Sequence, residues 1–142
     1  MSANRILVSS ESDFESTVGY SRAVRIGPHI AVAGTTGPVP ATDIGDIGAQ
    51  TREALRRIEV ALHQAGAVLS DVVRTRIYVT DISRWREIAA VHSEVFGDIR
   101  PAATMVEVAA LIAPELLVEI EADAYSEAQP PTGGNEPSLP AR

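Results

Sequence analysis

Charged side chains alternate with uncharged ones in two segments of the chain, and this spacing could gather reactive groups on one surface. Residues 71–80 carry Arg74, Arg76 and Tyr78 at alternate positions. Residues 117–124 carry Glu119, Glu121 and Asp123 in the same rhythm. Successive side chains of a strand point to opposite faces, so each segment is predicted to be a strand with a polar face. Guanidinium and carboxylate groups on a shared face could form ion pairs or line a cleft.

Two interpretations of this polar face remain open. It could be solvated, with cross-strand ion pairs that each contribute about 0.2–1 kcal/mol. It could instead be closed by other subunits, so that Arg76, Glu119 and Glu121 lie in an interface or line a cleft. The second interpretation is favoured, because helices on one side of the sheet would leave Tyr78 and Met105 uncovered.

Residue types that are missing exclude several reaction classes. All 12 basic residues are arginine, so there is no lysine for a Schiff base, for pyridoxal phosphate or for a Walker-type phosphate loop. The chain has no cysteine and therefore no thiolate nucleophile, disulfide or zinc–thiolate site. No cofactor is predicted.

Histidine and glycine patterns give little support to other chemistry. His29, His63 and His92 share no short ligand spacing, so no metal site is predicted. A nucleophile-elbow sequence for a serine triad is missing as well. The segment 34–40 is glycine- and proline-rich but lacks a phosphate-binding motif, and it is predicted to be a loop that breaks regular structure.

Length and charge point to one acidic domain. The 142 residues carry a formal net charge of -7, which disfavours a nucleic-acid partner. We find no apolar run of membrane-spanning length and no signal-peptide pattern, so a cytoplasmic protein without a membrane partner is expected. Residues 1–126 are predicted to form a single domain, and the Pro/Gly-rich residues 127–142 a disordered tail.

The elements that would position these groups can be read from periodicity. We predict a hairpin over 22–34 with its turn at Gly27 and Pro28, and an amphipathic helix over 46–65 that ends at Gly66. A second helix is predicted from an N-cap at Ser83 to Phe96, with Gly97 as its stop. The predicted strands are 71–80, 104–108 and 117–124. The fold class is therefore α+β, a two-layer sandwich with two helices on one face of a mixed sheet.

Several stretches resemble the Rid family, the reactive-intermediate deaminases also called the YjgF family. They are VGYSRAVRIGPHIAVAGTTGPVP, RTRIYVTDIS, RPAATMVEVAAL and VEIEADAY, which together span about residues 15–126 in the family's order. The resemblance implies a chorismate-mutase-like fold and a homotrimer with its helices outside. It also implies three ligand clefts between neighbouring subunits.

The resemblance also assigns candidate site residues. In deaminating members an arginine of a Pro-Ala-Arg segment grips the substrate carboxylate, and this chain has Ala103 there. Ala89 and Ala33 replace a cleft asparagine and a serine. Positions that still match the family are Tyr20, Gly34 and the water-positioning Glu119, and the cleft-lining positions are Thr104 and Met105. Arg76, Arg100 or Arg22 would supply a replacement cation.

The loss of the family arginine decides the functional expectation. We expect a homotrimer that binds a small metabolite between subunits without standard deaminase activity. The alternatives are an imine or enamine deaminase, with Glu119 orienting water and Tyr20 contacting the substrate, and a different reaction in the same cleft. The ribonuclease label that some relatives carry is disfavoured by the acidic charge and the missing lysines.

Overall fold

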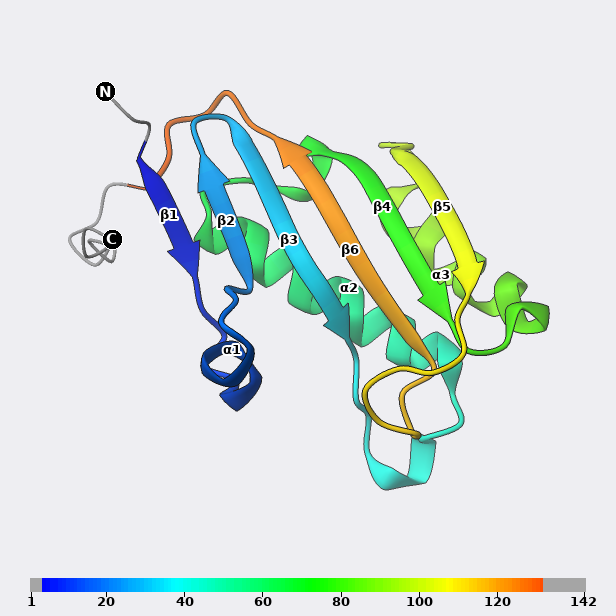
Figure 1. Cartoon of the computed structure of the whole chain (residues 1–142). Helices are drawn as coiled ribbons and strands as arrows, with labels where there is room; N and C mark the ends of the chain where they lie inside the picture. The colour runs from blue at the N-terminus through cyan, green and yellow to red at the C-terminus, as the bar shows by residue number, and fades with distance from the viewer. Residues whose placement is uncertain (1–3, 132–142) are drawn as a thin grey trace.

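In the part of the chain that the structure describes, six strands form one mixed sheet in the order β1-β2-β3-β6-β4-β5 (Figure 1). The computed structural model describes residues 4–131. The strands are β1 (Arg5–Val8), β2 (Ala23–Ile26), β3 (His29–Thr36), β4 (Val72–Val79), β5 (Ala102–Glu107) and β6 (Val118–Tyr125). β4 and β5 run parallel, and every other neighbouring pair is antiparallel.

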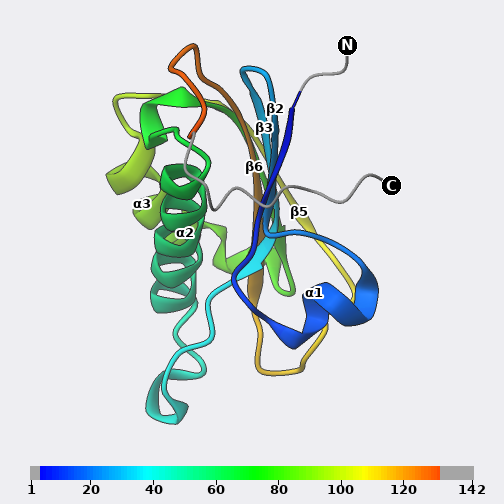
Figure 2. The ribbon, with the colours of Figure 1, turned by 90° about the vertical axis from the view of Figure 1, so that its left-hand side faces the viewer.

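Two helices, α2 (Ile47–Gln64) and α3 (Trp85–Phe96), cover one face of the sheet (Figure 2). The hydrophobic core lies between them and the sheet, with Ile58, Ile88 and Ile120 fully buried. A short helix, α1 (Asp13–Val18), lies at one end of the opposite face (Figure 2). The predicted α+β class, the mixed sheet and the two covering helices are confirmed.

Helix α2 begins and ends almost where the sequence predicted. The Asp46 side chain accepts a hydrogen bond from the Ala49 amide, which satisfies a free N–H of the first turn. At the other end Gly66 has a φ of 82°, a left-handed conformation that glycine adopts without a Cβ penalty. The buried face of α2 packs against β3 and β6, the strands that carry Gly34 and Glu119.

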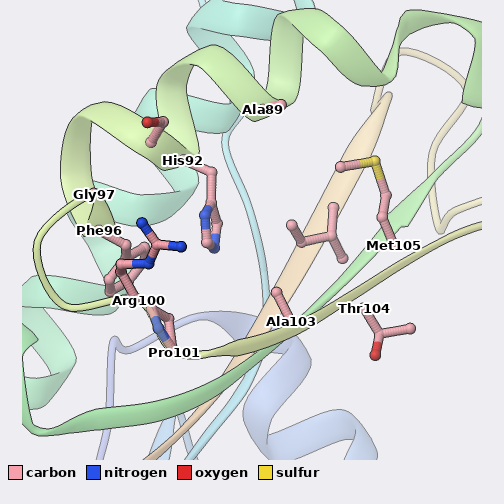
Figure 3. A pocket seen from close by; sticks show the side chains of 11 residues that line it. Ala89, His92, Phe96, Gly97, Arg100, Pro101, Ala103, Thr104 and Met105 are labelled. Carbon is pink, nitrogen blue, oxygen red and sulfur yellow. The ribbon is translucent and has the colours of Figure 1, made fainter.

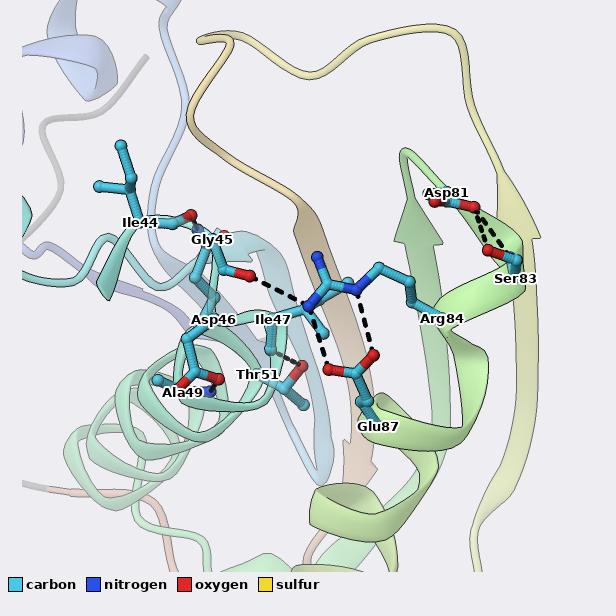
Figure 4. A network of polar contacts seen from close by, with 11 residues as sticks. Ile44, Gly45, Asp46, Ile47, Ala49, Thr51, Asp81, Ser83, Arg84 and Glu87 are labelled. Atoms are coloured by element: carbon cyan, nitrogen blue, oxygen red, sulfur yellow. Dashed lines mark hydrogen bonds and ion pairs between the residues drawn. The ribbon is translucent and has the colours of Figure 1, made fainter. Parts of the chain in front are cut away.

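The start of α3 differs from the prediction, whereas its predicted end at Phe96 is confirmed. Asp81, rather than Ser83, is the cap: its carboxylate accepts from the Ser83 amide and starts a short 3-10 turn that precedes α3. Arg84 in this turn donates to the Gly45 carbonyl and pairs with Glu87, which fixes the start of α3 against the loop before α2 (Figure 4). At the other end Gly97 is the C-cap, as predicted, but it keeps right-handed dihedral angles, and the left-handed residue is Arg100.

The N-terminal segment contains two elements that the periodicity did not predict, β1 and α1. Ser12 caps α1 by accepting from the Phe14 amide, and Glu15 follows three residues later, a spacing typical of helix starts. The predicted break at Gly34 is also wrong, because β3 continues to Thr36 through a bulge between Val32 and Thr35. The bulge leaves an extra residue of β3 without a partner, and pairing with β6 resumes at Thr35.

The start of the predicted tail contacts the domain. The Ala128 carbonyl accepts a hydrogen bond from the buried guanidinium of Arg25, at 2.6 Å. Residues 132–142 of that prediction lie outside the described residues, and the boundary at residue 126 stays a prediction. None of the helices in residues 4–131 has the length and apolar character needed to cross a membrane.

Candidate active site

The sheet face opposite α2 and α3 carries the charged residues that the alternation predicted. Arg76 Nη1 lies 3.1 Å from Asp123 Oδ2 and 3.6 Å from Glu121 Oε1. The Tyr78 hydroxyl donates to Glu121 Oε1 at 3.2 Å. Arg76 is therefore held by two carboxylates of β6, and the cross-strand ion pairs of the first interpretation are present.

Three predicted site residues, Tyr20, Gly34 and Glu119, line one groove. The groove has a volume of about 1270 Å³ and is bounded by α1, by α2 and by the loop that precedes β6. Exposed apolar side chains, Phe14, Val18 and Ile112 among them, line its outer part. A groove with an apolar rim and a few polar groups at its base is a typical small-molecule site.

Arg22 organises the base of this groove. Its Nη2 donates to the Tyr20 hydroxyl at 2.9 Å, and its Nη1 donates to the Gly34 carbonyl at 2.7 Å and to Thr35 Oγ1 at 3.1 Å. The guanidinium carbon also lies 5.4 Å from the centre of the Tyr20 ring. The sequence offered Arg22 only as one of three replacement cations, yet it is the one that contacts two predicted site positions.

The bulge in β3 brings Gly34 against Glu119. A Cβ added at Gly34 would collide with Glu119 Oε2 and lie 3.0 Å from Glu119 Cδ. Thr36 is the strand partner of Glu119, so the shifted register after Val32 sets this closeness. Glycine therefore leaves the space that the carboxylate occupies.

Burial is the main cause that raises the pKa of Glu119. The neighbouring charge of Glu121 also raises this pKa, while Arg22 lowers it. The hydrogen bonds found among residues 4–131 leave the Glu119 carboxylate free, so it can bind a ligand or a water molecule. A half-buried carboxyl with a raised pKa in a groove is a candidate general acid or base.

Two buried side chains hold the walls of the groove. The Glu15 carboxylate accepts hydrogen bonds from Ser9 Oγ, Ser10 Oγ and the Ser10 amide, which fixes α1 to the end of β1. Gln50 of α2 donates to the Glu115 carbonyl at 2.9 Å and accepts from the Leu117 amide at 2.8 Å. Gln50 thereby fixes the loop that leads directly into Glu119.

The remaining predicted site residues lie elsewhere in the chain. Met105 and Arg100 line a second pocket of about 510 Å³, on the helix side of the sheet between α3 and β5 (Figure 3). Ala89 and Ala103, the positions of the family asparagine and arginine, line the same pocket. Thr104 is at its edge and is paired in register with Arg76. A single chain therefore divides the predicted site between two faces of the sheet.

Possible metal ligands do not cluster in the described part of the chain. Within residues 4–131 no group of three histidine, aspartate or glutamate side chains could hold a metal ion. Glu119, Tyr20 and Arg22 give the groove groups suited to acid–base catalysis, water orientation and binding of a polar ligand.

Comparison with known proteins gives consistent matches. Residues 10–126 match the family described as Endoribonuclease L-PSP. A crystal structure from Mycobacterium tuberculosis, described as a member of the highly conserved YjgF/YER057c/UK114 family, is 71% identical; the match has a TM-score of 0.81 and covers 86% of this chain and 99% of that chain. A RutC family protein of Pyrococcus abyssi is 40% identical over 111 residues, which are 76% of this chain and 87% of the relative. The 3-aminoacrylate deaminase RutC of Acinetobacter baylyi is 38% identical over 82 residues, 58% of this chain and 64% of the relative.

Proposed function

This chain belongs to the YjgF/Rid family, which carries the description Endoribonuclease L-PSP, and from that membership we propose that it is a chorismate-mutase-like homotrimer that binds a small metabolite between its subunits. The resemblance found in the sequence is confirmed at the level of the family. A cytoplasmic location stays a prediction from the sequence.

The division of the site between two faces of the sheet supports the clefts between subunits. The resemblance places Glu119 and the position of Ala103 in one cleft, but in a single chain they line separate concavities. They could share a cleft if the groove of one subunit faced the second pocket of its neighbour. Exposed apolar side chains on the open sheet face, such as Val106 and Tyr125, support closure of that face by other copies.

The observation that carries the proposal is the Glu119 carboxyl above Gly34, beside the Tyr20–Arg22 pair. This arrangement offers a ligand one group with a raised pKa, one phenol and one fixed cation in a single groove. Ala103 removes the bidentate grip on a substrate carboxylate that the family arginine provides. We therefore propose binding without standard deaminase activity.

Imine hydrolysis is the second candidate, favoured by the raised pKa of Glu119 and by the similarity to a 3-aminoacrylate deaminase. In that reaction Glu119 would take a proton from water as the water oxygen attacks the C=N carbon. That proton would pass to the nitrogen and give a carbinolamine. The hydroxyl proton would then move to the nitrogen as the C=O bond forms and the C–N bond breaks, which releases a 2-keto acid and ammonia.

Two measurements test the proposal. Light scattering at micromolar concentration should give the mass of three chains, and a monomer mass would contradict it. A freshly generated 2-imino acid should release ammonia at the same rate with wild type, with Glu119→Ala and in buffer. Acceleration by the wild type that is lost in Glu119→Ala would replace the proposal with the deaminase.

A further inference from the structure

The groove at Glu119 reaches across an edge of the sheet to helix α2. In the described part of the chain β2 pairs with β3 only as far as Val32, so residues 34–36 have no strand neighbour on that side. Helices α1 and α2 lie on opposite faces of the sheet (Figure 2), yet both line this groove. A ligand in the groove can therefore contact the open sheet face at one end and α2 at the other.

The α2 end of the groove carries a cation whose donors are only partly used. The Glu53 carboxylate accepts two hydrogen bonds from Arg56, through Nε and Nη2 at 2.8 Å each, but only one from Arg57, through Nε at 2.9 Å. One carboxylate thus faces two guanidinium groups, and the cluster keeps a positive charge. The hydrogen bonds found among residues 4–131 leave both Nη groups of Arg57, a lining residue of the groove, free for an anion.

The sheet end of the groove offers a free acceptor instead. Arg22 at this end already donates to three protein oxygens, and Glu121 is bonded to the Tyr78 hydroxyl. The Glu119 carboxylate has no such partner among the described residues, and a carboxylate accepts hydrogen bonds from the N–H groups of an amine. The two ends of the groove are therefore complementary to opposite charges.

Apolar side chains supply the remaining walls of this groove. Phe14 and Val18 come from α1, Val60 from α2 and Ile112 from the loop before β6. These four side chains are between 42% and 69% exposed, although each is large and apolar. Val60 lies three residues after Arg57, so the two share one side of α2. An apolar chain between two charged groups would cover these side chains.

We propose that the groove binds an ω-amino acid, whose amine bonds to Glu119 and whose carboxylate pairs with the free Nη groups of Arg57. Ala103 is consistent with this ligand, because it provides no guanidinium for a carboxylate next to the nitrogen. Packed layers of secondary structure lie about 10 Å apart, so a 2-amino acid is too short to reach both ends. This inference rests on the proposed function, because it names the ligand class of the Glu119 groove.

Chain length of the ligand gives the first test. Extended 8-aminooctanoate places about 9–10 Å between its nitrogen and its carboxyl carbon, whereas 3-aminopropanoate places less than half of that. Calorimetric titration of the wild type should therefore show at least tenfold tighter binding of 8-aminooctanoate. Equal or weaker binding of the longer amino acid would overturn the inference.

Substitution of Arg57 tests the anion end. Arg57→Gln leaves Glu53 paired with Arg56, and it should lower the affinity for 8-aminooctanoate at least tenfold. The methyl ester of 8-aminooctanoate keeps the amine but lacks the anion, so it should bind both proteins equally. Arg52→Gln is the matched control, because Arg52 lies on the same helix, pairs with Glu94 and does not line the groove. Wild-type affinity for 8-aminooctanoate in Arg57→Gln would overturn the inference.

Substitution of Glu119 tests the amine end and separates the two proposals. Glu119→Gln should weaken binding of both 8-aminooctanoate and its methyl ester. If it does, and the protein is a trimer, but Arg57→Gln binds 8-aminooctanoate normally, the ligand class is wrong and the proposed function stands. A monomer by light scattering removes the proposed function, whatever the Arg57 variant does.

Discussion

Replacing Arg25 with methionine should lower the stability of the domain more than any surface substitution of an arginine. Arg25 is 1% exposed, and its guanidinium bonds to backbone carbonyls at the ends of three segments. The three shortest bonds go to Gly27 O (2.8 Å), Ala65 O (2.8 Å) and Ala128 O (2.6 Å). The cation also faces the carboxyl end of α2, where the helix dipole favours positive charge.

The expected loss follows from these bonds. Methionine fills most of the apolar volume but leaves three carbonyls without their donor, and each such loss costs about 1 kcal/mol or more. We expect a loss of about 3 kcal/mol in the free energy of unfolding. For a domain of this size that corresponds to a fall of about 6–12 °C in melting temperature.

Urea denaturation at a fixed protein concentration measures this loss, because stability of an oligomer depends on concentration. Arg56→Met is the matched control: Arg56 pairs with Glu53 on the exposed side of α2, and its loss should leave the urea midpoint nearly unchanged. If the free energy of unfolding of Arg25→Met also lies within about 1 kcal/mol of the wild-type value, the cost of burying the guanidinium equals the gain from its hydrogen bonds. That result would refute the reasoning.

Three further predictions concern the groove, the packing and the response to acid. Glu121→Gln should lower the pKa of Glu119 by removing a like charge, whereas Arg22→Gln should raise this pKa by removing an opposite charge. A carbon-detected NMR titration measures the pKa of Glu119, and a shift in the same direction in both variants would contradict the prediction. Gly37→Ala should cost more than about 2 kcal/mol, because the new Cβ would collide with the Gln50 carbonyl and lie 2.6 Å from the Ala54 amide nitrogen; an unchanged urea midpoint would contradict this. Burial lowers the pKa of His92, so the neutral imidazole stabilises the fold above about pH 6.5, and this stabilisation is lost as the pH falls through the lowered pKa. The free energy of unfolding of His92→Gln should therefore decline less steeply below about pH 6.5 than that of the wild type. An equally steep decline in the two proteins would contradict this prediction.

The fold was largely predictable because its main elements have strong periodicity. The apolar repeat of Ile47–Gln64 and the alternation in Val118–Tyr125 gave the helix and strand that carry most of the core. Helix α1 has only six residues, too few for a periodic signal, although the spacing of Ser12 and Glu15 is a usable capping pattern. The bulge at Gly34 has no such local signal, because it depends on pairing with β6.

The candidate site was predictable only in part. Tyr20, Gly34 and Glu119 were named from the family resemblance, and the structure brings them into one groove. The anchoring role of Arg22 depends on contacts with the bulge, which spacing alone does not reveal. The buried Arg25 was missed for a similar reason: arginine is rarely buried, and its partners are carbonyls 2 to 103 residues away along the chain.

Calorimetric titration of the protein with 2-oxobutanoate, in wild type and in Glu119→Ala, tests the central claim most directly. If the Glu119 groove is the metabolite site, the wild type should bind and the variant should lose at least tenfold in affinity, about 1.4 kcal/mol. Equal affinity in the two proteins, or no binding to the wild type, would contradict the claim that Glu119 lines a site for small metabolites.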